Sequence, residues 1–224
     1  QDLVALIRAD TPLIVVETSD EMRVVELFRQ SLTRVWRALY RWSITEGLRR
    51  LDLDREDPVQ APPDAGAALA AIRGADQRGV YLLLDFHPYL GYAGTQRQLR
   101  EILQRRGCLA HTVVLVGHKV ELPGELDARA ARLRLRLPDA NALLKLVREE
   151  IAAFQRENQG RRVEADDAVV RRIVRNLQGL DAMDARRIAR HLIHDDGALG
   201  PNDLPELARL KFELLNKSGH LHYE

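Results

Sequence analysis

Cysteine is almost absent from this chain of 224 residues, which contains only Cys108. One cysteine cannot form an internal disulfide bond, and this composition is typical of a reducing compartment. The sequence also lacks an apolar run of the roughly 18–20 residues that a membrane-spanning helix requires. Its N-terminal stretch, QDLVALIRAD, carries charges where a secretory signal peptide has its apolar centre. We therefore expect a cytoplasmic protein that makes no contact with a membrane.

An excess of charge of one sign is missing as well, because the formal net charge is only +1 at pH 7. Bulk charge therefore gives no indication of a nucleic-acid or membrane partner. Lysine is scarce among the 34 basic residues; the lysines are Lys119, Lys145, Lys211 and Lys217. Arginine is the better bidentate ligand of phosphate, but a GC-rich genome produces the same bias without any function.

Five short segments have the composition of β-strands. Residues 13–17, 80–86 and 112–117 are continuous apolar runs, which are typical of strands buried on both faces of a sheet. Residues 35–43 and 132–137 mix apolar with charged side chains, which is typical of strands with one exposed face. Helical segments separate the strands, and this alternation predicts right-handed crossovers and a parallel sheet.

The burial pattern also predicts the order of these strands. The apolar strands belong in the centre of the sheet, and the arginine-containing ones belong at its edges, where charge prevents edge-to-edge aggregation. This arrangement fits the order 5-1-4-3-2 of the AAA-type, P-loop-like nucleotide-binding core. After Pro138 we expect only helices, at residues 139–157, 166–177, 182–195 and 202–216. The predicted fold is a five-stranded parallel α/β sheet flanked by helices, followed by a helical lid.

The same pattern divides the chain into three predicted parts. Residues 1–137 form the α/β core, residues 138–217 form the lid, and residues 218–224 form a connector. The first residue is Gln1 rather than Met, so we expect the chain to be part of a longer protein.

Several stretches resemble one particular family. They are IRADTPLIVVETSDEMRVVELF, RWSITEGLRRLD, LLLDFHPYL, LRLPD and the terminal KFELLNKSGHLHYE. Together they resemble the N-terminal half of the Ycf-type AAA ATPases of plastids, cyanobacteria and other bacteria, over essentially the whole chain. In that family a segment like KSGHLHYE leads into a second AAA module. The resemblance implies that this C-terminal module of the parent chain is the partner and that it uses ATP and magnesium.

The phosphate-binding loop of such ATPases, GxxxxGK[ST], is missing. In that loop the glycines let backbone N–H groups converge on phosphate, and a lysine reaches the outer phosphates. Between the first strand and its helix this sequence has ETSDEM, without Gly or Lys and with the carboxylates of Glu17, Asp20 and Glu21. These acids would repel a triphosphate. We therefore expect no nucleotide cofactor in this domain.

The end of the third strand retains one residue of the expected site. Asp85 matches the metal-binding carboxylate of AAA cores, whereas the following catalytic Glu position is Phe86. Without that base, no residue is placed to orient an attacking water. We therefore expect Asp85 to be vestigial and this region not to be an enzyme.

A metal-dependent enzyme is an alternative hypothesis. Asp85 and His87 follow one strand and His118 follows the next, so they should converge at the carboxyl edge of the sheet. Carboxylate and imidazole groups can bind zinc or manganese. The plainer interpretation is that both histidines hydrogen-bond to loops at the strand ends.

The predicted lid carries a stripe of arginines. They are Arg171, Arg172, Arg175, Arg186, Arg187 and Arg190. In active AAA modules a lid arginine senses the γ-phosphate, and Arg186 or Arg187 occupies a comparable place. The alternatives are a solvated face with salt bridges and an interface, either with another subunit of a homo-oligomer or with nucleic acid. Arg171, Arg172, Arg175 and Arg190 are the candidate interface residues.

Aromatic residues mark the second predicted strand. Trp36, Tyr40 and Trp42 share one parity, so we expect all three to project from the same face. Packing under a helix and a docking patch for a partner domain both fit this pattern.

The leading hypothesis is a non-catalytic AAA-like domain that regulates, assembles or docks the ATPase following it in the parent chain. The alternative is an arginine-rich nucleic-acid-binding module with an inactive AAA fold. Fold alone does not decide between them.

Overall fold

The computed structural model describes residues 3–33, 35–52 and 59–217. The chain divides into two compact units, Gln1–Leu135 and Arg136–Glu224, and each has its own hydrophobic core. The predicted connector at residues 218–224 lies outside the described residues. None of the described helices has the length and apolar composition needed to cross a bilayer.

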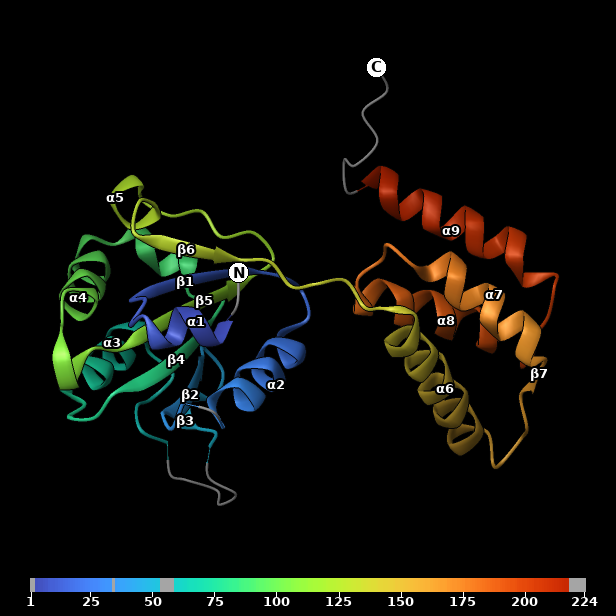
Figure 1. Cartoon of the computed structure of the whole chain (residues 1–224), viewed down its shortest axis with the longest axis horizontal. Coiled ribbons are helices and arrows are strands. Elements are labelled where there is room, and N and C mark those ends of the chain that lie inside the picture. Colours follow the sequence, from blue (N-terminus) through green and yellow to red (C-terminus); the bar gives the residue numbers. More distant parts are fainter. Residues whose placement is uncertain (1–2, 34, 53–58, 218–224) are drawn as a thin grey trace. The chain divides into compact units, whose positions relative to one another are not determined.

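A mainly parallel sheet forms the centre of the N-terminal unit, and its described strands lie in the order β3-β2-β4-β5-β1-β6 (Figure 1). Their bounds are β1 Leu13–Glu17, β2 Ala38–Ser43, β3 Gly47–Arg50, β4 Gly79–Leu84, β5 Thr112–Gly117 and β6 Ala130–Leu133. The five predicted strands correspond to β1, β2, β4, β5 and β6. They pair in parallel in the predicted order, so this part of the fold prediction is confirmed.

Strand β3 is absent from the sequence-based prediction. It pairs antiparallel with β2, with Tyr40 opposite Arg50 and Ser43 opposite Gly47. The prediction that the second strand lies at the edge of the sheet is therefore wrong. Gly47 has φ +73, and a Cβ there would lie only 2.3 Å from the carbonyl oxygen of Ala61. Only glycine fits this start of β3 without strain.

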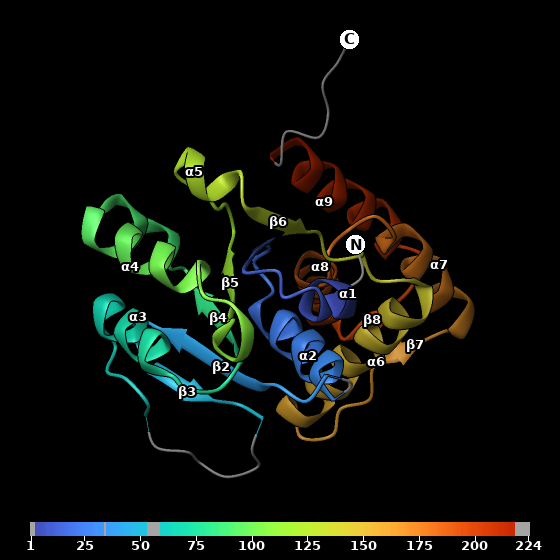
Figure 2. The same ribbon diagram turned by 60° about the vertical axis from the view of Figure 1, so that its left-hand side comes forward.

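Alternate residues of the central strands pack into two separate cores. In β1, Leu13 and Val15 belong to one core, whereas Ile14 and Val16 belong to the other. This follows from the two-residue period of a strand. The first core includes helices α3 (Ala65–Gly74) and α4 (Ala93–Leu103), and the second includes α1 (Leu3–Arg8) and α2 (Glu21–Leu32), on opposite faces of the sheet (Figure 2). The unit therefore has three layers.

These helices and the shorter ones of the unit have the following bounds. They are α1 Leu3–Arg8, α2 Glu21–Leu32, α3 Ala65–Gly74, α4 Ala93–Leu103 and α5 Gly124–Asp127, with 3₁₀ turns at His87–Gly91 and Gly107–Leu109.

The aromatic residues around β2 differ in burial and packing. Trp42 is fully buried and contacts Phe86 edge to face, with 5.1 Å between ring centroids. Tyr40 stacks on Tyr81 at 4.8 Å, so both β2 aromatics pack on the core as one of the two interpretations expected. Trp36 precedes the strand, has φ +52 and is 95% exposed. The expectation that it shares their face is wrong, because the strand begins only at Ala38.

The C-terminal unit is built mainly from helices α6 Ala140–Glu157, α7 Asp167–Leu177, α8 Ala182–Asp196 and α9 Asp203–Lys217. Their apolar faces form one core, which includes Leu143, Phe154, Ile173, Ile188 and Leu207. All four predicted helices are present. The expectation that no strand follows Pro138 is wrong, because β7 (Glu164–Ala165) and β8 (Ala198–Leu199) pair in parallel.

Candidate functional site

The connection between β1 and α2 is the place where P-loop ATPases hold phosphate. It consists of residues 18–20. The Oδ1 of Asp20 accepts a hydrogen bond from the backbone N–H of Arg23 at 3.1 Å, and the Asp20 N–H donates to Thr18 Oγ1 at 3.0 Å. An N-cap carboxylate uses the same free amides that would bind a phosphate. The N-terminus of α2 is therefore capped by a negative charge from the chain itself.

A second carboxylate ties neighbouring loops together at this edge of the sheet. Glu17 ends β1, and its Oε1 accepts hydrogen bonds from the Val120 N–H at 3.1 Å and from Arg132 Nη1 at 3.2 Å. Arg132, in β6, also donates to Asp127 at 2.7 Å. The carboxylate of Glu17 is thus engaged in holding the segment after β5 against β6.

A third carboxylate, Glu21, begins α2. Burial raises its pKa above the ordinary value, the nearby Asp85 carboxylate raises it further, and Arg41 acts in the opposite direction. The carboxylates of Glu21 and Asp85 therefore repel each other, and Arg41 offsets part of this repulsion. This part of the edge is therefore already crowded with negative charge.

The residues considered as metal ligands lie at this edge, but their side chains do not all contact one another. Asp85 follows β4 with φ +48, and its N–H donates to the Val116 carbonyl at 2.8 Å. A Cβ on Gly117 would lie 3.1 Å from both Asp85 Oδ1 and His87 Cε1, so these two side chains pack over Gly117. His118 Nδ1 is instead hydrogen-bonded with Ser19 Oγ at 3.0 Å.

Among the side chains that the structure describes, which do not include those of Cys108, Asp195 and Asp196, no group of three or more His, Cys, Asp or Glu is arranged to hold a metal ion. Asp85, His87 and His118 are therefore not gathered into a three-ligand group in this structure. The hydrogen bond of His118 matches the plainer interpretation of that residue.

Phe86 occupies the position compared with the catalytic Glu. Its side chain is fully buried in the core beside α3 and α4. The ring contacts Trp42 and also Tyr89, with 5.7 Å between the centroids of Phe86 and Tyr89. This position is therefore part of an aromatic cluster and is not exposed to a ligand at the edge of the sheet.

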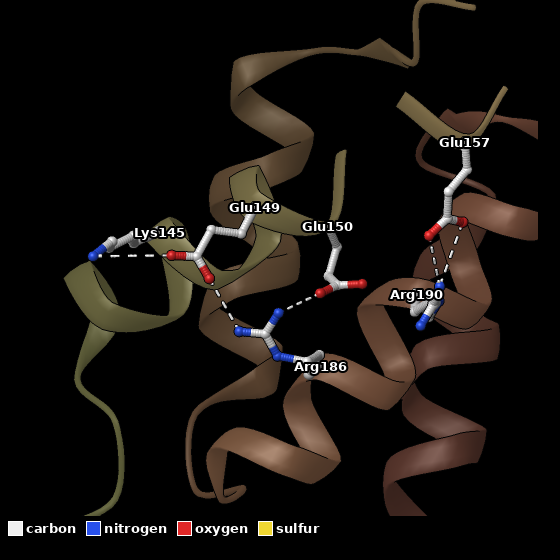
Figure 3. Close-up of polar contacts among 6 residues, drawn as sticks. All are labelled: Lys145, Glu149, Glu150, Glu157, Arg186 and Arg190. Atoms are coloured by element: carbon white, nitrogen blue, oxygen red, sulfur yellow. Dashed lines mark hydrogen bonds and ion pairs between the residues drawn. The ribbon is translucent and has the colours of Figure 1, made fainter. Parts of the chain in front are cut away.

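The arginines of α8 are engaged within the C-terminal unit (Figure 3). Arg186 donates to Glu149 at 3.0 Å and to Glu150, whose side chain is only 6% exposed. Burial acts to lower the pKa of Arg186, but hydrogen bonds to Glu149 and Glu150 outweigh it and raise the pKa. Arg190 donates to Glu157 at 3.1 Å.

The remaining arginines of the stripe differ in their pairing. Arg187 is paired with Asp184 at 3.1 Å. Arg171, Arg172 and Arg175 are exposed on α7, and none of them has an ion pair within the part of the chain that the structure describes. Among the described residues, Arg186 and Arg190 therefore pair across to α6 and Arg187 pairs within α8, whereas the arginines of α7 form no ion pair.

Glu150 and Arg37 are not recognisable as buried charged residues from the sequence. Glu150 lies among polar residues of α6, and its burial depends on the packing of α6 against α8, which only the folded chain reveals. Arg37 precedes β2, and its side chain is 7% exposed in an ion pair with Asp10. In the sequence, Trp36 and Arg37 belong to an alternating pattern that predicts a strand, and this pattern does not indicate a buried arginine.

Two family models match the chain in succession. The model described as "SpoVK-like AAA ATPase, N-terminal domain" matches residues 1–135, and "SpoVK-like AAA ATPase, second domain" matches residues 141–218. Among curated proteins, the AAA domain-containing protein ycf46 of Trieres chinensis is 21% identical over 99% of this chain and 43% of its own length. The ycf46 protein of Pyropia yezoensis is 23% identical, over 100% of this chain and 44% of its own length. The chain spans less than half of these relatives.

Solved structures share the fold. The FIGL-1 AAA domain in complex with ADP has a TM-score of 0.55 and 14% identity, with 95% of this chain and 80% of that chain covered. A structure of Thermotoga maritima RuvB has a TM-score of 0.51 and 16% identity, with 95% and 65% covered. These likenesses show an AAA-like α/β fold. The two family matches show that the chain belongs to the SpoVK-like AAA ATPases and comprises their N-terminal and second domains.

Proposed function

We propose that this chain is a non-catalytic AAA-like region that regulates, assembles or docks an AAA module of the same parent protein. The observation that carries the proposal is the cap on α2. The carboxylate of Asp20 takes the place at the helix N-terminus that a phosphate group occupies in P-loop ATPases. A ligand phosphate would have to displace this carboxylate from the helix N-terminus. It would also be repelled by the negative charge of the carboxylate as it approached.

The surroundings of the cap support the same conclusion. Glu21 and Asp85 already repel each other, and ATP would add further negative charge to this edge. The Phe86 side chain is buried in the aromatic cluster, so no base stands at the position that would orient an attacking water. Hydrolysis would therefore lack both a phosphate cradle and a general base.

The proposed partner follows from the length of the relatives. This chain covers 43% of the Trieres chinensis protein, and a segment like KSGHLHYE leads into a second AAA module in the Ycf-type family. We infer that such a module, which uses ATP and magnesium, follows in the parent and that the parent works in the cytoplasm. The two units described above would then act as a scaffold for it.

The cap on α2 predicts that the purified chain neither hydrolyses ATP nor binds it in a magnesium-dependent way. The measurements are phosphate release and calorimetric titration with ATP, each with magnesium and with EDTA. An Asp85→Asn variant provides the matched control, because loss of a metal-binding carboxylate weakens magnesium-dependent binding in an active site. We expect wild type and Asp85→Asn to give the same result. Micromolar binding that requires both magnesium and Asp85 would overturn the proposal.

A second candidate function is binding of nucleic acid, and α7 supports it. Arg171, Arg172 and Arg175 are neighbours on the helix surface, because residues three and four apart lie side by side. They have no ion pairs in the described part of the chain, so their guanidinium groups are available for phosphates.

If this second candidate is correct, the chain binds a fluorescent DNA duplex at low salt with a steep salt dependence. Substituting Arg171, Arg172 and Arg175 together by Gln should remove about 0.9 from the logarithmic salt slope for each phosphate that these side chains neutralise. The control replaces the paired arginines Arg187 and Arg190 by Gln. Absence of binding at low salt, or equally weakened binding in both variants, would eliminate this function.

A further inference from the structure

A cavity of about 540 Å³ lies in the N-terminal unit, at the edge of the sheet where β2 and β4 begin. Its lining comes from the end of α2 (Leu32), the start of β2 (Ala38), the end of β3 (Arg50) and the segment before β4 (Gln77). Ligands of open parallel sheets normally bind at the opposite, carboxyl edge. This cavity is therefore distinct from the candidate site built around Asp20.

The lining of this cavity is rich in guanidinium groups. Arg29, Arg37, Arg50 and Arg78 line it, and Asp52 is the acidic residue among the described lining side chains. Arg50 is paired with Asp52, and Arg37 and Arg78 share Asp10, so four guanidinium groups face two carboxylates. Arg29 donates to the Leu51 carbonyl, a neutral group that does not compensate the positive charge of the guanidinium. The excess of positive charge favours an anionic ligand.

One of these arginines is almost fully buried. The side chain of Arg37 is 7% exposed, and its Nη2 is paired with Asp10. Its Nη1 is buried and has no hydrogen-bond partner among the residues that the structure describes. Buried donors of this kind are nearly always satisfied. A phosphate at this wall of the cavity would first have to move the side chains that cover Nη1. It would then satisfy the planar guanidinium group, which matches phosphate geometry.

An exposed aromatic ring adjoins the same cavity. Trp36 is one of the lining residues and is 95% exposed. Its φ of +52 is strained for a bulky residue. The N–H groups of Val35 and Trp36 both donate to the Leu32 carbonyl, at 3.0 and 3.1 Å, and hold this turn. The backbone therefore keeps an indole in solvent next to a cluster of arginines, where it can stack on a planar ring.

We propose that this cavity binds a nucleoside phosphate, with the phosphate on Arg37 and Arg78 and the base stacked on Trp36. The volume lies within the roughly 300–1,000 Å³ that is usual for small-molecule sites. Binding at this edge requires neither a phosphate loop nor magnesium. The inference is thus independent of whether the Asp20 edge is inactive.

The test is titration of the whole chain with AMP in EDTA, followed by tryptophan fluorescence and calorimetry. Trp36 is exposed and Trp42 is buried, so a ligand in the cavity should quench the exposed indole. We expect saturable binding of AMP, and binding at least about tenfold weaker for ribose 5-phosphate, which has no base to stack. A 5′-phosphorylated oligonucleotide that binds tighter than AMP assigns the site to strand ends, whereas weaker binding assigns it to free nucleotides.

Two variants separate the cavity from other sites. Trp36→Ala changes a fully exposed side chain and should weaken AMP binding about tenfold or more, and Arg37→Lys should weaken it about tenfold. Tyr92→Ala, a 69% exposed aromatic outside the cavity, and Asp85→Asn should bind AMP like wild type. The proposal is overturned if AMP shows no saturable binding at millimolar concentration, or if Trp36→Ala binds it as tightly as wild type.

Discussion

Replacing Phe86 by glutamate is expected to destabilise the N-terminal unit severely and not to create ATP hydrolysis. The ring is fully buried against Trp42 and Tyr89. Removing a buried Phe side chain costs roughly 3–5 kcal/mol, and placing a carboxylate in the same space adds to that loss. The sum is comparable to the roughly 5–15 kcal/mol that stabilises a typical domain. Urea unfolding followed by circular dichroism measures the effect.

The matched control for this substitution is Tyr92→Glu, because Tyr92 is 69% exposed and an exposed change of this kind costs less than about 0.5 kcal/mol. Phe86→Leu, which keeps an apolar side chain, should cost about 1.5 kcal/mol or less. A Phe86→Glu variant as stable as wild type would contradict the buried position. A stable variant that hydrolyses ATP would contradict the proposed function as well.

Replacing Arg186 by alanine is expected to destabilise the C-terminal unit by about 3 kcal/mol. The substitution leaves Glu150, whose side chain is 6% exposed, without its charged partner (Figure 3). Loss of one member of a buried pair costs about 3–5 kcal/mol. The Arg186 side chain is itself 45% exposed, so solvent reduces the effect to the lower end of that range. Thermal and urea unfolding of the whole chain give the measurement.

Arg190 supplies the control, because its side chain and that of its partner Glu157 are about equally exposed, at 55% and 49%. Arg190→Ala should therefore cost no more than about 1 kcal/mol. The double variant Arg186→Ala with Glu150→Leu should recover most of the lost stability, because an apolar side chain can replace a buried ion pair. Equal destabilisation by the two arginine substitutions, or no recovery in the double variant, would show that Glu150 is not the cause.

The sequence predicts the order of the parallel strands because that order depends on burial, and burial is visible in composition. Strands such as β5, whose residues 113–116 are all apolar, lie inside the sheet. Strand β3 has only four residues, Gly47–Arg50, and two of them are arginine. Four residues are too few to show the two-residue period of a strand. The pairing with β2 defines this strand instead.

The two edges of the sheet differ in how far the sequence reveals them. At the carboxyl edge, Asp20 directly precedes an amphipathic helix, so its role as a cap is readable from local order. At the opposite edge, the cavity beside Arg37 gathers residues from four separate segments. The positive φ of Trp36 also leaves no trace in the alternating pattern. Contacts between distant segments and backbone twist are tertiary properties that periodicity does not encode.

The arginine stripe illustrates the same limit. Arg171 and Arg186 have the same chemistry and both lie on exposed helix faces. Arg186 meets Glu149 and Glu150 because α8 packs beside α6, whereas Arg171 on α7 has no ion pair among the described residues. Which arginine is paired thus depends on helix packing and not on spacing along the chain.

The short link between β1 and α2 also limits the sequence changes by which this chain could gain a phosphate-binding loop. A phosphate loop needs about eight residues with glycines at fixed places, whereas residues 18–20 make the whole link. Point mutations alone cannot lengthen it, and each insertion would first break the cap that Asp20 gives α2. A phosphate-binding loop could therefore arise at this place only through an insertion that also rebuilt the start of α2.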